Sequence, residues 1–319
     1  MKKIIITIMT FSLLYINNCS SIVEEDNKPK TPQVDIVWES IGLDSCWIYS
    51  MVFMDNGDFY AGTNYGLFLS TDSGINWSLA NQFLSGTVTC FYKHSNGRVF
   101  AGTSGQGLFT SSDNGISWDD LGLQNYSISS ITVSNSGKVF AGTRGNGIFV
   151  AEGLDENWVQ ADINFQLEIF PSLFTTDRNI IYAGNTGVYR SLDDGKSWYK
   201  KNQGLGNWSV QSLIIDNSGN VCAGTDNGGF FITSNDGETW TKYNNGLTNT
   251  EITSLAINNL GHIFAGTWKG GVYRLINNES EWESVDSLLT MKQVADLIID
   301  KNQNLYAGTF KGIFKALTN

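Results

Sequence analysis

The sequence predicts an all-β protein, a seven-bladed β-propeller with four-stranded antiparallel blades. Composition agrees, because 34 glycines, 3 prolines and 13% aromatic residues are typical of short strands joined by tight turns. A tripeptide, Ala-Gly-Thr or once Ala-Gly-Asn, recurs at steps of 40 to 42 residues, beginning at Ala61, Ala101, Ala141, Ala183, Ala223, Ala265 and Ala307. Tryptophan recurs at similar steps, at Trp77, Trp118, Trp158, Trp198, Trp240 and Trp282.

Each repeat contains four short strands in a constant order. An apolar strand ends at a turn such as Asn56-Gly57, and a second strand ends in the Ala-Gly-Thr tripeptide. A glycine-rich turn then opens a third strand, such as residues 107–109, and a further turn leads to the tryptophan strand. Four short strands in a period of about 41 residues are typical of one propeller blade.

The last repeat lacks its fourth strand, because the chain ends after strand three, which runs to about Lys315. The N-terminal segment Val37-Trp38-Glu39-Ser40 is similar to the tryptophan strand that begins at Trp282, and Trp38 lies 39 residues before Trp77. A three-stranded last blade would leave an unpaired edge beside the first blade. We therefore expect residues 35–319 to form the propeller, with the Trp38 segment completing the last blade.

Residues 1–18 have the pattern of a signal peptide. Lys2 and Lys3 precede an apolar run of 13 residues at positions 4–16, which is too short to span a bilayer as a helix. The following segment, 16–20, resembles a bacterial lipoprotein box in which Cys19 is lipidated after cleavage. Asn18 departs from the small residue usual before that cysteine, so an ordinary signal peptide is the alternative.

Residues 19–34 are predicted to be a lipidated cysteine and a flexible tether, because they lack apolar periodicity and contain Pro29 and Pro32. By resemblance to bacterial lipoproteins, Ser20 favours the outer membrane, and the acidic run at 24–26 is similar to a surface-export tag. We expect an outer-membrane lipoprotein on the cell surface or the periplasmic side, attached to the membrane only through its lipid.

The charge of the chain disfavours two classes of partner, nucleic acids and anionic lipid surfaces. The formal net charge is −11, and removing Lys2 and Lys3 leaves 18 basic against 31 acidic residues. Nucleic acids and anionic lipid surfaces are bound by clustered lysine and arginine, which an acidic chain of this kind lacks. We therefore expect no nucleic-acid partner.

The segment from Ser70 to Trp77 resembles the Asp box (BNR repeat) of sialidase-like propellers, Ser-x-Asp-x-Gly-x-Thr-Trp. Segments 111–118, 191–198 and 233–240 are similar to it. An aspartate in such a turn can accept hydrogen bonds from turn amides, which predicts a structural role for the box positions Asp72, Asp113, Asp193 and Asn235. The other half of each repeat resembles propellers of two-component regulators and of photosystem II assembly-factor-like proteins. These resemblances imply a fold and not one activity.

The candidate binding residues lie in loops on the face opposite the Asp-box turns, where sialidase-like families have their chemistry. In three neighbouring blades this face should carry aromatic side chains with lysines beside them, and Arg144 is predicted on the same face. Aromatic rings with cations suit sugar stacking or a protein hot spot. The alternative is that the rings pack on neighbouring loops or plug the central channel. The tentative ligand-binding set is Trp47, Tyr65, Arg144, Trp268, Lys269, Phe310 and Lys311.

The sialidase resemblance implies three arginines that clamp a substrate carboxylate, and this chain does not fit it. The chain has five arginines, and the repeat pattern places only Arg144 on the candidate face.

Other catalytic classes are also disfavoured. His94 and His262 fall near turns on the Asp-box face, and Cys46, Cys90 and Cys222 lack metal-ligand spacing. We expect no catalytic residue, no metal and no cofactor, and at least one free thiol among the three cysteines.

The sequence therefore predicts a non-enzymatic exported lipoprotein, a monomer that acts as a binding or scaffold module for a protein or a glycan. The alternative is a glycan-active hydrolase or lyase that uses acidic residues on the loop face. Glu168, Asp226 and Glu251 are predicted there, and two carboxylates are the usual apparatus of glycosidases.

Overall fold

The computed structural model describes residues 36–80, 84–154, 157–161, 165, 168–206, 208–277 and 279–318. The chain divides into two units, Met1–Val34 and Asp35–Asn319, and every described residue belongs to the second. The predicted signal peptide (1–18), the lipidation site Cys19 and the tether (19–34) lie outside the described residues.

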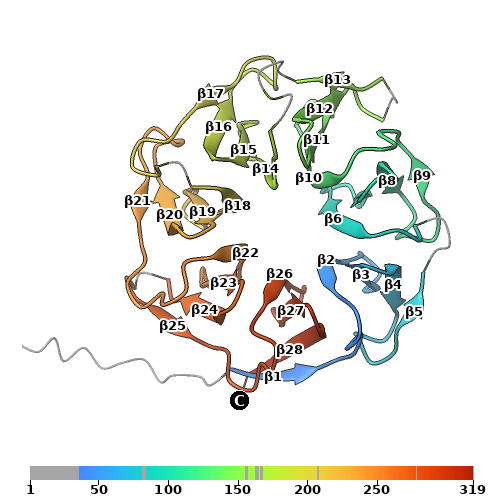
Figure 1. Ribbon diagram of the computed structural model, residues 1–319, viewed down its shortest axis with the longest axis vertical. Helices are drawn as coiled ribbons and strands as arrows, with labels where there is room; N and C mark the ends of the chain where they lie inside the picture. Colours follow the sequence, from blue (N-terminus) through green and yellow to red (C-terminus); the bar gives the residue numbers. More distant parts are fainter. Residues whose placement is uncertain are drawn as a thin grey trace, which may run out of the picture. The chain divides into compact units, whose positions relative to one another are not determined.

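The fold of the described residues is the predicted seven-bladed β-propeller. Seven four-stranded antiparallel sheets stand around a central axis, and the described part of the chain contains no α-helix (Figure 1). Blades 1 to 6 are β2–β5, β6–β9, β10–β13, β14–β17, β18–β21 and β22–β25, and blade 7 is β26–β28 with β1. The innermost strands are β2 (Ile48–Phe53), β6 (Val88–Lys93), β10 (Ile128–Val133), β14 (Ser172–Thr175), β18 (Val210–Ile215), β22 (Ile252–Ile257) and β26 (Val294–Ile299).

Three further strands lie outward of the innermost strand in each blade. The second strands are β3 (Phe59–Thr63), β7 (Val99–Thr103), β11 (Val139–Thr143), β15 (Ile181–Asn185), β19 (Val221–Thr225), β23 (Ile263–Thr267) and β27 (Leu305–Thr309). The third strands are β4 (Gly66–Ser70), β8 (Leu108–Ser111), β12 (Ile148–Ala151), β16 (Gly187–Ser191), β20 (Gly229–Thr233), β24 (Gly271–Leu275) and β28 (Gly312–Thr318). The outermost strands are β5 (Ser78–Leu79), β9 (Asp119–Asp120), β13 (Val159–Gln160), β17 (Tyr199–Lys200), β21 (Thr241–Lys242), β25 (Trp282–Ser284) and β1 (Ile36–Ser40).

The ring closes as the sequence predicts. β1 pairs antiparallel with β28, with Trp38 opposite Ala316, and completes blade 7 (Figure 1). Trp38 is only 3% exposed, and its Nε1 donates a hydrogen bond of 2.7 Å to the carbonyl oxygen of Val285. Val285 follows β25 in blade 6, so the Trp38 side chain connects β1 to blade 6, while strand pairing connects β1 to blade 7.

The recurring tripeptide, Ala-Gly-Thr in six blades and Ala-Gly-Asn in blade 4, ends the second strand, and all five residues of that strand are buried. A Cβ on Gly62 would lie 2.8 Å from the carbonyl oxygen of Val88 in the next blade, so only glycine permits this close approach. The hydroxyl of Thr63 donates a hydrogen bond of 2.9 Å to the carbonyl oxygen of Gly66 and secures the turn into the third strand. Packing between blades therefore explains the motif.

The turns that resemble Asp boxes connect the third and fourth strands. The Asp72 carboxylate accepts hydrogen bonds of 2.8 Å from the backbone N of Asn76 and from the hydroxyl of Ser70. Hydrogen bonds from the backbone and side chain of Asn76 lower the pKa of Asp72 to about 2. Gly74 has a φ of +94°, which glycine adopts at little cost. In this geometry the carboxylate holds the turn.

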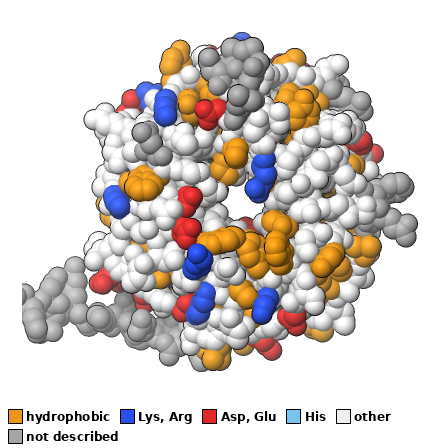
Figure 2. All heavy atoms as spheres, viewed as in Figure 1, with side chains coloured by type: hydrophobic (Ala, Val, Ile, Leu, Met, Phe, Trp, Pro, Cys, Tyr) orange, Lys and Arg blue, Asp and Glu red, His pale blue; other side chains and the backbone are white. Residues whose placement is uncertain are grey.

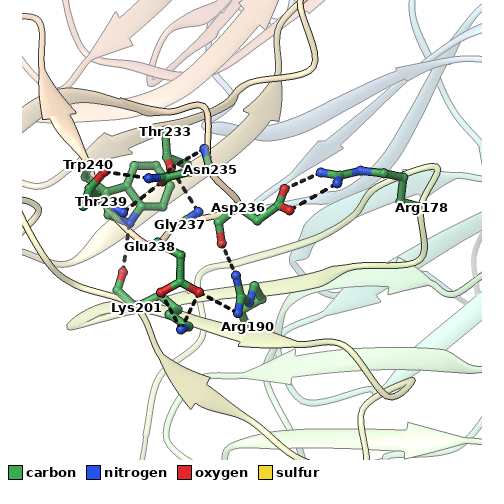
Figure 3. Close-up of polar contacts among 10 residues, drawn as sticks. All are labelled: Arg178, Arg190, Lys201, Thr233, Asn235, Asp236, Gly237, Glu238, Thr239 and Trp240. Carbon is green, nitrogen blue, oxygen red and sulfur yellow. Dashed lines mark hydrogen bonds and ion pairs between the residues drawn. The ribbon is translucent and has the colours of Figure 1, made fainter.

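The equivalent turn in blade 5 has an amide in place of the carboxylate (Figure 3). The Oδ1 atom of Asn235 accepts hydrogen bonds of 2.9 Å from the backbone N of Thr239 and from the hydroxyl of Thr233. The amide oxygen thus occupies the place of the carboxylate oxygen, and the turn does not need a negative charge.

Candidate functional site

A cavity of about 470 Å³ occupies the central channel, and residues from the inner strands of all seven blades line it. Trp268, Phe310 and Arg144, which lie in turns between second and third strands, line the same cavity. Figure 2 shows the opening at the centre of the ring, with hydrophobic side chains gathered over blades 6, 7 and 1 and acidic side chains close to them. This channel mouth is the candidate functional site.

Three of the aromatic residues predicted for the site form one cluster, here called the aromatic row. The ring centroids of Trp47 and Phe310 are 5.1 Å apart, and those of Trp268 and Phe310 are 4.9 Å apart in an edge-to-face contact. The three rings come from blades 1, 7 and 6, so the row crosses two blade boundaries. Trp47 is 50% exposed, and the other two are half-buried, so ring surface remains available to a partner.

The other predicted residues lie around this row. Tyr65 is 60% exposed on blade 1, and none of the ring contacts within the described residues involves it. Lys269 and Lys311 are exposed, each next in sequence to a ring of the row. Arg144 is exposed on blade 3 and lines the channel on a different part of its rim.

Two predicted acidic residues share a smaller cavity, here called the side pocket. It has a volume of about 230 Å³, and its lining consists of Gln211, Asp226, Glu251, Ile252, Thr253 and Trp268. The backbone N of Trp268 donates a hydrogen bond of 3.0 Å to the carbonyl oxygen of Glu251, which ties the aromatic row to the pocket. The third predicted acid, Glu168, is not in the pocket, and its carboxylate accepts a hydrogen bond from Asn185.

A ring of small polar residues in the channel wall was missed by sequence reasoning. Each member pairs with the glycine of the Ala-Gly-Thr or Ala-Gly-Asn strand in its own blade. Each also lies eleven residues before the alanine of that tripeptide, a fixed offset that would have revealed the ring. This channel ring consists of Ser50, Cys90, Ser130, Ser172, Ser212, Ser254 and Asp296.

Asp296 is the one charged member of the channel ring. Its carboxylate accepts hydrogen bonds of 2.8 Å from the backbone N of Met51 and of 3.2 Å from the hydroxyl of Ser254. Although these bonds favour the ionised form, burial outweighs them and raises the pKa of Asp296 to about 7. The residue joins blade 7 to blade 1 at the point where the ring closes.

In other blades a serine hydroxyl accepts the equivalent hydrogen bond from the backbone of the next blade. Ser50 accepts a hydrogen bond of 3.2 Å from the backbone N of Phe91, and Ser212 accepts one of 3.1 Å from that of Leu255. Five members of the channel ring, the four serines Ser50, Ser130, Ser212 and Ser254 together with Asp296, therefore connect neighbouring blades.

The arginines do not assemble a carboxylate clamp. Arg178 and Arg190 of blade 4 bind the Asp-box-like turn of blade 5, on the opposite face (Figure 3). Arg178 pairs with the carboxylate of Asp236, whereas Arg190 donates to the backbone oxygen of Asp236 at 2.7 Å and to Glu238 at 2.9 Å. Of the five arginines, all of which the structure describes, only Arg144 lines the channel cavity.

The described residues contain no cluster of three or more His, Cys, Asp or Glu side chains that could hold a metal ion. Cys46, Cys90 and Cys222 are all buried free thiols, in agreement with the expectation of at least one. Burial raises the pKa of Cys90 to about 12, which makes this channel thiol unreactive at neutral pH. Among the described residues, no helix has the length and apolar character that a membrane span requires.

A fifth aromatic residue on this face, Trp208, was also missed. Trp208 precedes β18 in the connection between blades 4 and 5, and it is 41% exposed. A Cβ on Gly228 would lie 2.6 Å from its ring, so it packs against the turn after Asp226. Exposed aromatic surface thus extends beyond the three blades in which the sequence placed it.

A larger cavity, of about 570 Å³, lies on the opposite face between blades 1 and 7. Two lysines, Lys93 and Lys301, line it. Lys93 forms an ion pair of 2.6 Å with Asp55 and donates a hydrogen bond of 2.9 Å to the carbonyl oxygen of Phe53. Lys93 and Asp55 therefore satisfy each other, and the lining has no aromatic cluster comparable with the aromatic row.

No protein-family model and no curated protein sequence matches this chain. The extracellular domain of BT4673 from B. thetaiotaomicron, described as a one component system, is similar in structure, with 18% identity and a TM-score of 0.73 over 88% of this chain and 39% of that chain. YCF48 bound to D1 peptide has 16% identity and a TM-score of 0.68, over 88% of this chain and 97% of that one. Virginiamycin B lyase from Staphylococcus aureus has 12% identity and a TM-score of 0.74, over 90% of this chain and 100% of that chain.

These similarities define the class of protein as a seven-bladed β-propeller and, at such identities, establish the fold alone. The chain spans about two fifths of the length of the BT4673 extracellular-domain chain. The propeller fold expected from the repeat resemblances is confirmed. Membership of an Asp-box family stays a prediction.

Proposed function

We propose that this protein is a non-enzymatic binding module whose partner, a protein or a glycan, docks on the aromatic row at the channel mouth. The observation that carries the proposal is the meeting of Trp47, Phe310 and Trp268 from three blades beside a 470 Å³ cavity, with half of Trp47 exposed. Rings that served only to pack loops together would be more fully buried. Exposed aromatic rings beside a cavity are typical of hot spots.

Two of the structural neighbours support this proposal, whereas virginiamycin B lyase is named as an enzyme, and none names a ligand for this chain. BT4673 contributes an extracellular domain, and YCF48 was solved with a bound peptide. In the same proposal the chain is exported by its signal peptide and lipidated at Cys19. It is held as a monomer on the outer membrane, on the cell surface or the periplasmic side.

The test replaces Trp268 and Phe310 with alanine together and measures binding to peptide and glycan arrays. Loss of both rings should weaken binding of any ligand found by about tenfold or more, as expected for hot-spot aromatics. The melting temperature should stay near that of the wild type. Tyr199→Ala, which removes an exposed aromatic from the outermost strand β17, is the matched control and should leave binding unchanged. A large fall in melting temperature in the double variant would assign the row to packing and overturn the proposal.

The side pocket favours one alternative, a glycan-active hydrolase or lyase, because Asp226 and Glu251 line a single cavity. An enzyme of this kind should release reducing ends from a polysaccharide panel. It should lose that activity in Asp226→Asn and Glu251→Gln. Saturable binding without turnover supports the binding module instead.

A further inference from the structure

The side pocket is a concave site at the boundary between blades 5 and 6. Asp226 follows β19 of blade 5, and Glu251 precedes β22 of blade 6. The half-buried ring of Trp268 and the buried side chain of Ile252 provide apolar wall, and Gln211 and Thr253 complete it. At about 230 Å³ the pocket is large enough for one long side chain and adjoins the aromatic row through Trp268.

The two carboxylates of the pocket have no cationic partner within the described residues. The ion pairs in that part of the chain engage other acids, such as Asp236 with Arg178 and Asp55 with Lys93. Asp226 accepts one hydrogen bond of 2.8 Å, from the side chain of Asn227, which leaves further acceptor capacity on its carboxylate. Two unpaired negative charges beside an indole ring favour a cation, since the ring face and the carboxylates attract positive charge together.

We infer that the side pocket receives an arginine or lysine side chain of a protein partner whose apolar surface lies on the aromatic row. This inference rests on the proposed function, because pocket and row share Trp268. The charged head group of such a side chain satisfies Asp226 and Glu251, and its methylene stem packs along Ile252 and Trp268. A neutral sugar would leave both charges uncompensated, so the chemistry of the pocket favours a basic protein over a glycan.

The net negative charge of the whole chain also favours a basic partner. The mature sequence would carry 18 basic against 31 acidic residues, and an excess of this sign steers basic partners toward the surface. No lysine or arginine lines the side pocket itself, although Lys269 follows Trp268 in sequence on blade 6, and Arg144 lies on a different blade of the rim.

The test uses two synthetic peptides that differ only in charge. One alternates arginine and glycine, and the other has citrulline, the neutral isostere, in place of each arginine. Binding to the wild-type protein is measured by calorimetry at low and high salt. The arginine peptide should bind about tenfold or more tightly than the citrulline peptide, as expected for charge-assisted hydrogen bonds, and should weaken with salt.

Protein variants then locate the interaction. The double variant Asp226→Asn, Glu251→Gln should lose most of the preference for the arginine peptide, and each single variant should lose part of it. Glu168→Gln is the matched control, because it removes an acid predicted on the same face that is held by Asn185 outside the pocket. It should bind the arginine peptide like the wild type. Equal losses in the control and the double variant would overturn the inference by showing a diffuse charge effect.

The outcomes separate this inference from the proposed function. Failure of the wild type to prefer the arginine peptide overturns the inference, whatever the aromatic row does. A neutral oligosaccharide whose binding depends on Trp268 but is indifferent to the Asp226 and Glu251 variants supports the proposed function and overturns the basic partner. If the double variant melts far below the wild type, the single variants decide the question, since each keeps the size of the side chain it replaces.

Discussion

Replacing Asp296 with serine tests whether burial in the channel disfavours the ionised carboxylate at this position. Serine is the residue at five of the other six positions, and at four of them its hydroxyl bonds to the backbone of the next blade, as Ser50 does with Phe91. In the variant the new hydroxyl should accept the hydrogen bond that the Asp296 carboxylate accepts from the backbone N of Met51. The substitution therefore removes a buried charge while keeping the contact between blades 7 and 1.

The magnitude follows from the raised pKa. The carboxyl titrates near 3.8 when exposed and at about 7 in the folded protein, so full ionisation of Asp296 costs about 4 kcal/mol. This figure is an upper bound, because the channel admits some water. Since the folded state binds this proton more tightly, the stabilising contribution is complete below about pH 4 and is lost as the pH rises through about 7. Between about pH 5 and about pH 8, the wild type should lose about 2–3 kcal/mol that the serine variant keeps.

The assay is urea unfolding followed by tryptophan fluorescence at about pH 5 and about pH 8. The free energy of unfolding of Asp296→Ser relative to the wild type should rise with pH, and at the higher pH the variant should be the more stable protein. Cys90, with a pKa of about 12, does not titrate in this range and cannot produce the effect. Parallel pH profiles for the two proteins would refute the claim that burial governs the ionisation of Asp296.

Two further predictions concern the packing between blades. Trp38→Ala should destabilise the propeller by about 3–5 kcal/mol, because it leaves a cavity at a buried site and removes the hydrogen bond to Val285. Urea unfolding measures this loss of stability. An unfolding midpoint equal to that of the wild type would contradict the closure of blade 7 by β1. Gly62→Ala should cost about 1–3 kcal/mol, because the new methyl group meets the carbonyl oxygen of Val88 at 2.8 Å; an unchanged melting temperature would show that the blades can separate at little cost.

The fold could be predicted in detail because a propeller repeats one unit. Each Ala-Gly-Thr tripeptide marks a second strand, and the similarity of the Trp38 segment to the strand at Trp282 identifies the strand that completes blade 7. Local periodicity is enough for such conclusions, because neighbouring blades are also neighbours in sequence.

The candidate site could be predicted only in part, because it depends on side-chain directions at blade boundaries. Sequence reasoning grouped Trp47, Trp268 and Phe310 on one face, but it included Tyr65, which takes no part in the described ring contacts. It missed Trp208, which lies in a connection between blades where the repeat pattern is weakest. The joint placement of Asp226 and Glu251 requires the register of two sheets.

The pairing of β1 with β28 has a consequence for how the chain matures. β1 emerges first during synthesis, whereas β28 emerges last of the described strands, and Trp38 lies 247 residues from Val285, whose oxygen it binds. Until the final repeat is made, the nascent chain carries an unpaired strand with Ile36 and Trp38 uncovered. A truncated chain that lacks β28 would keep this strand unpaired and its apolar side chains exposed. Proteases and chaperones that recognise such segments would therefore act on truncated chains and not on complete ones.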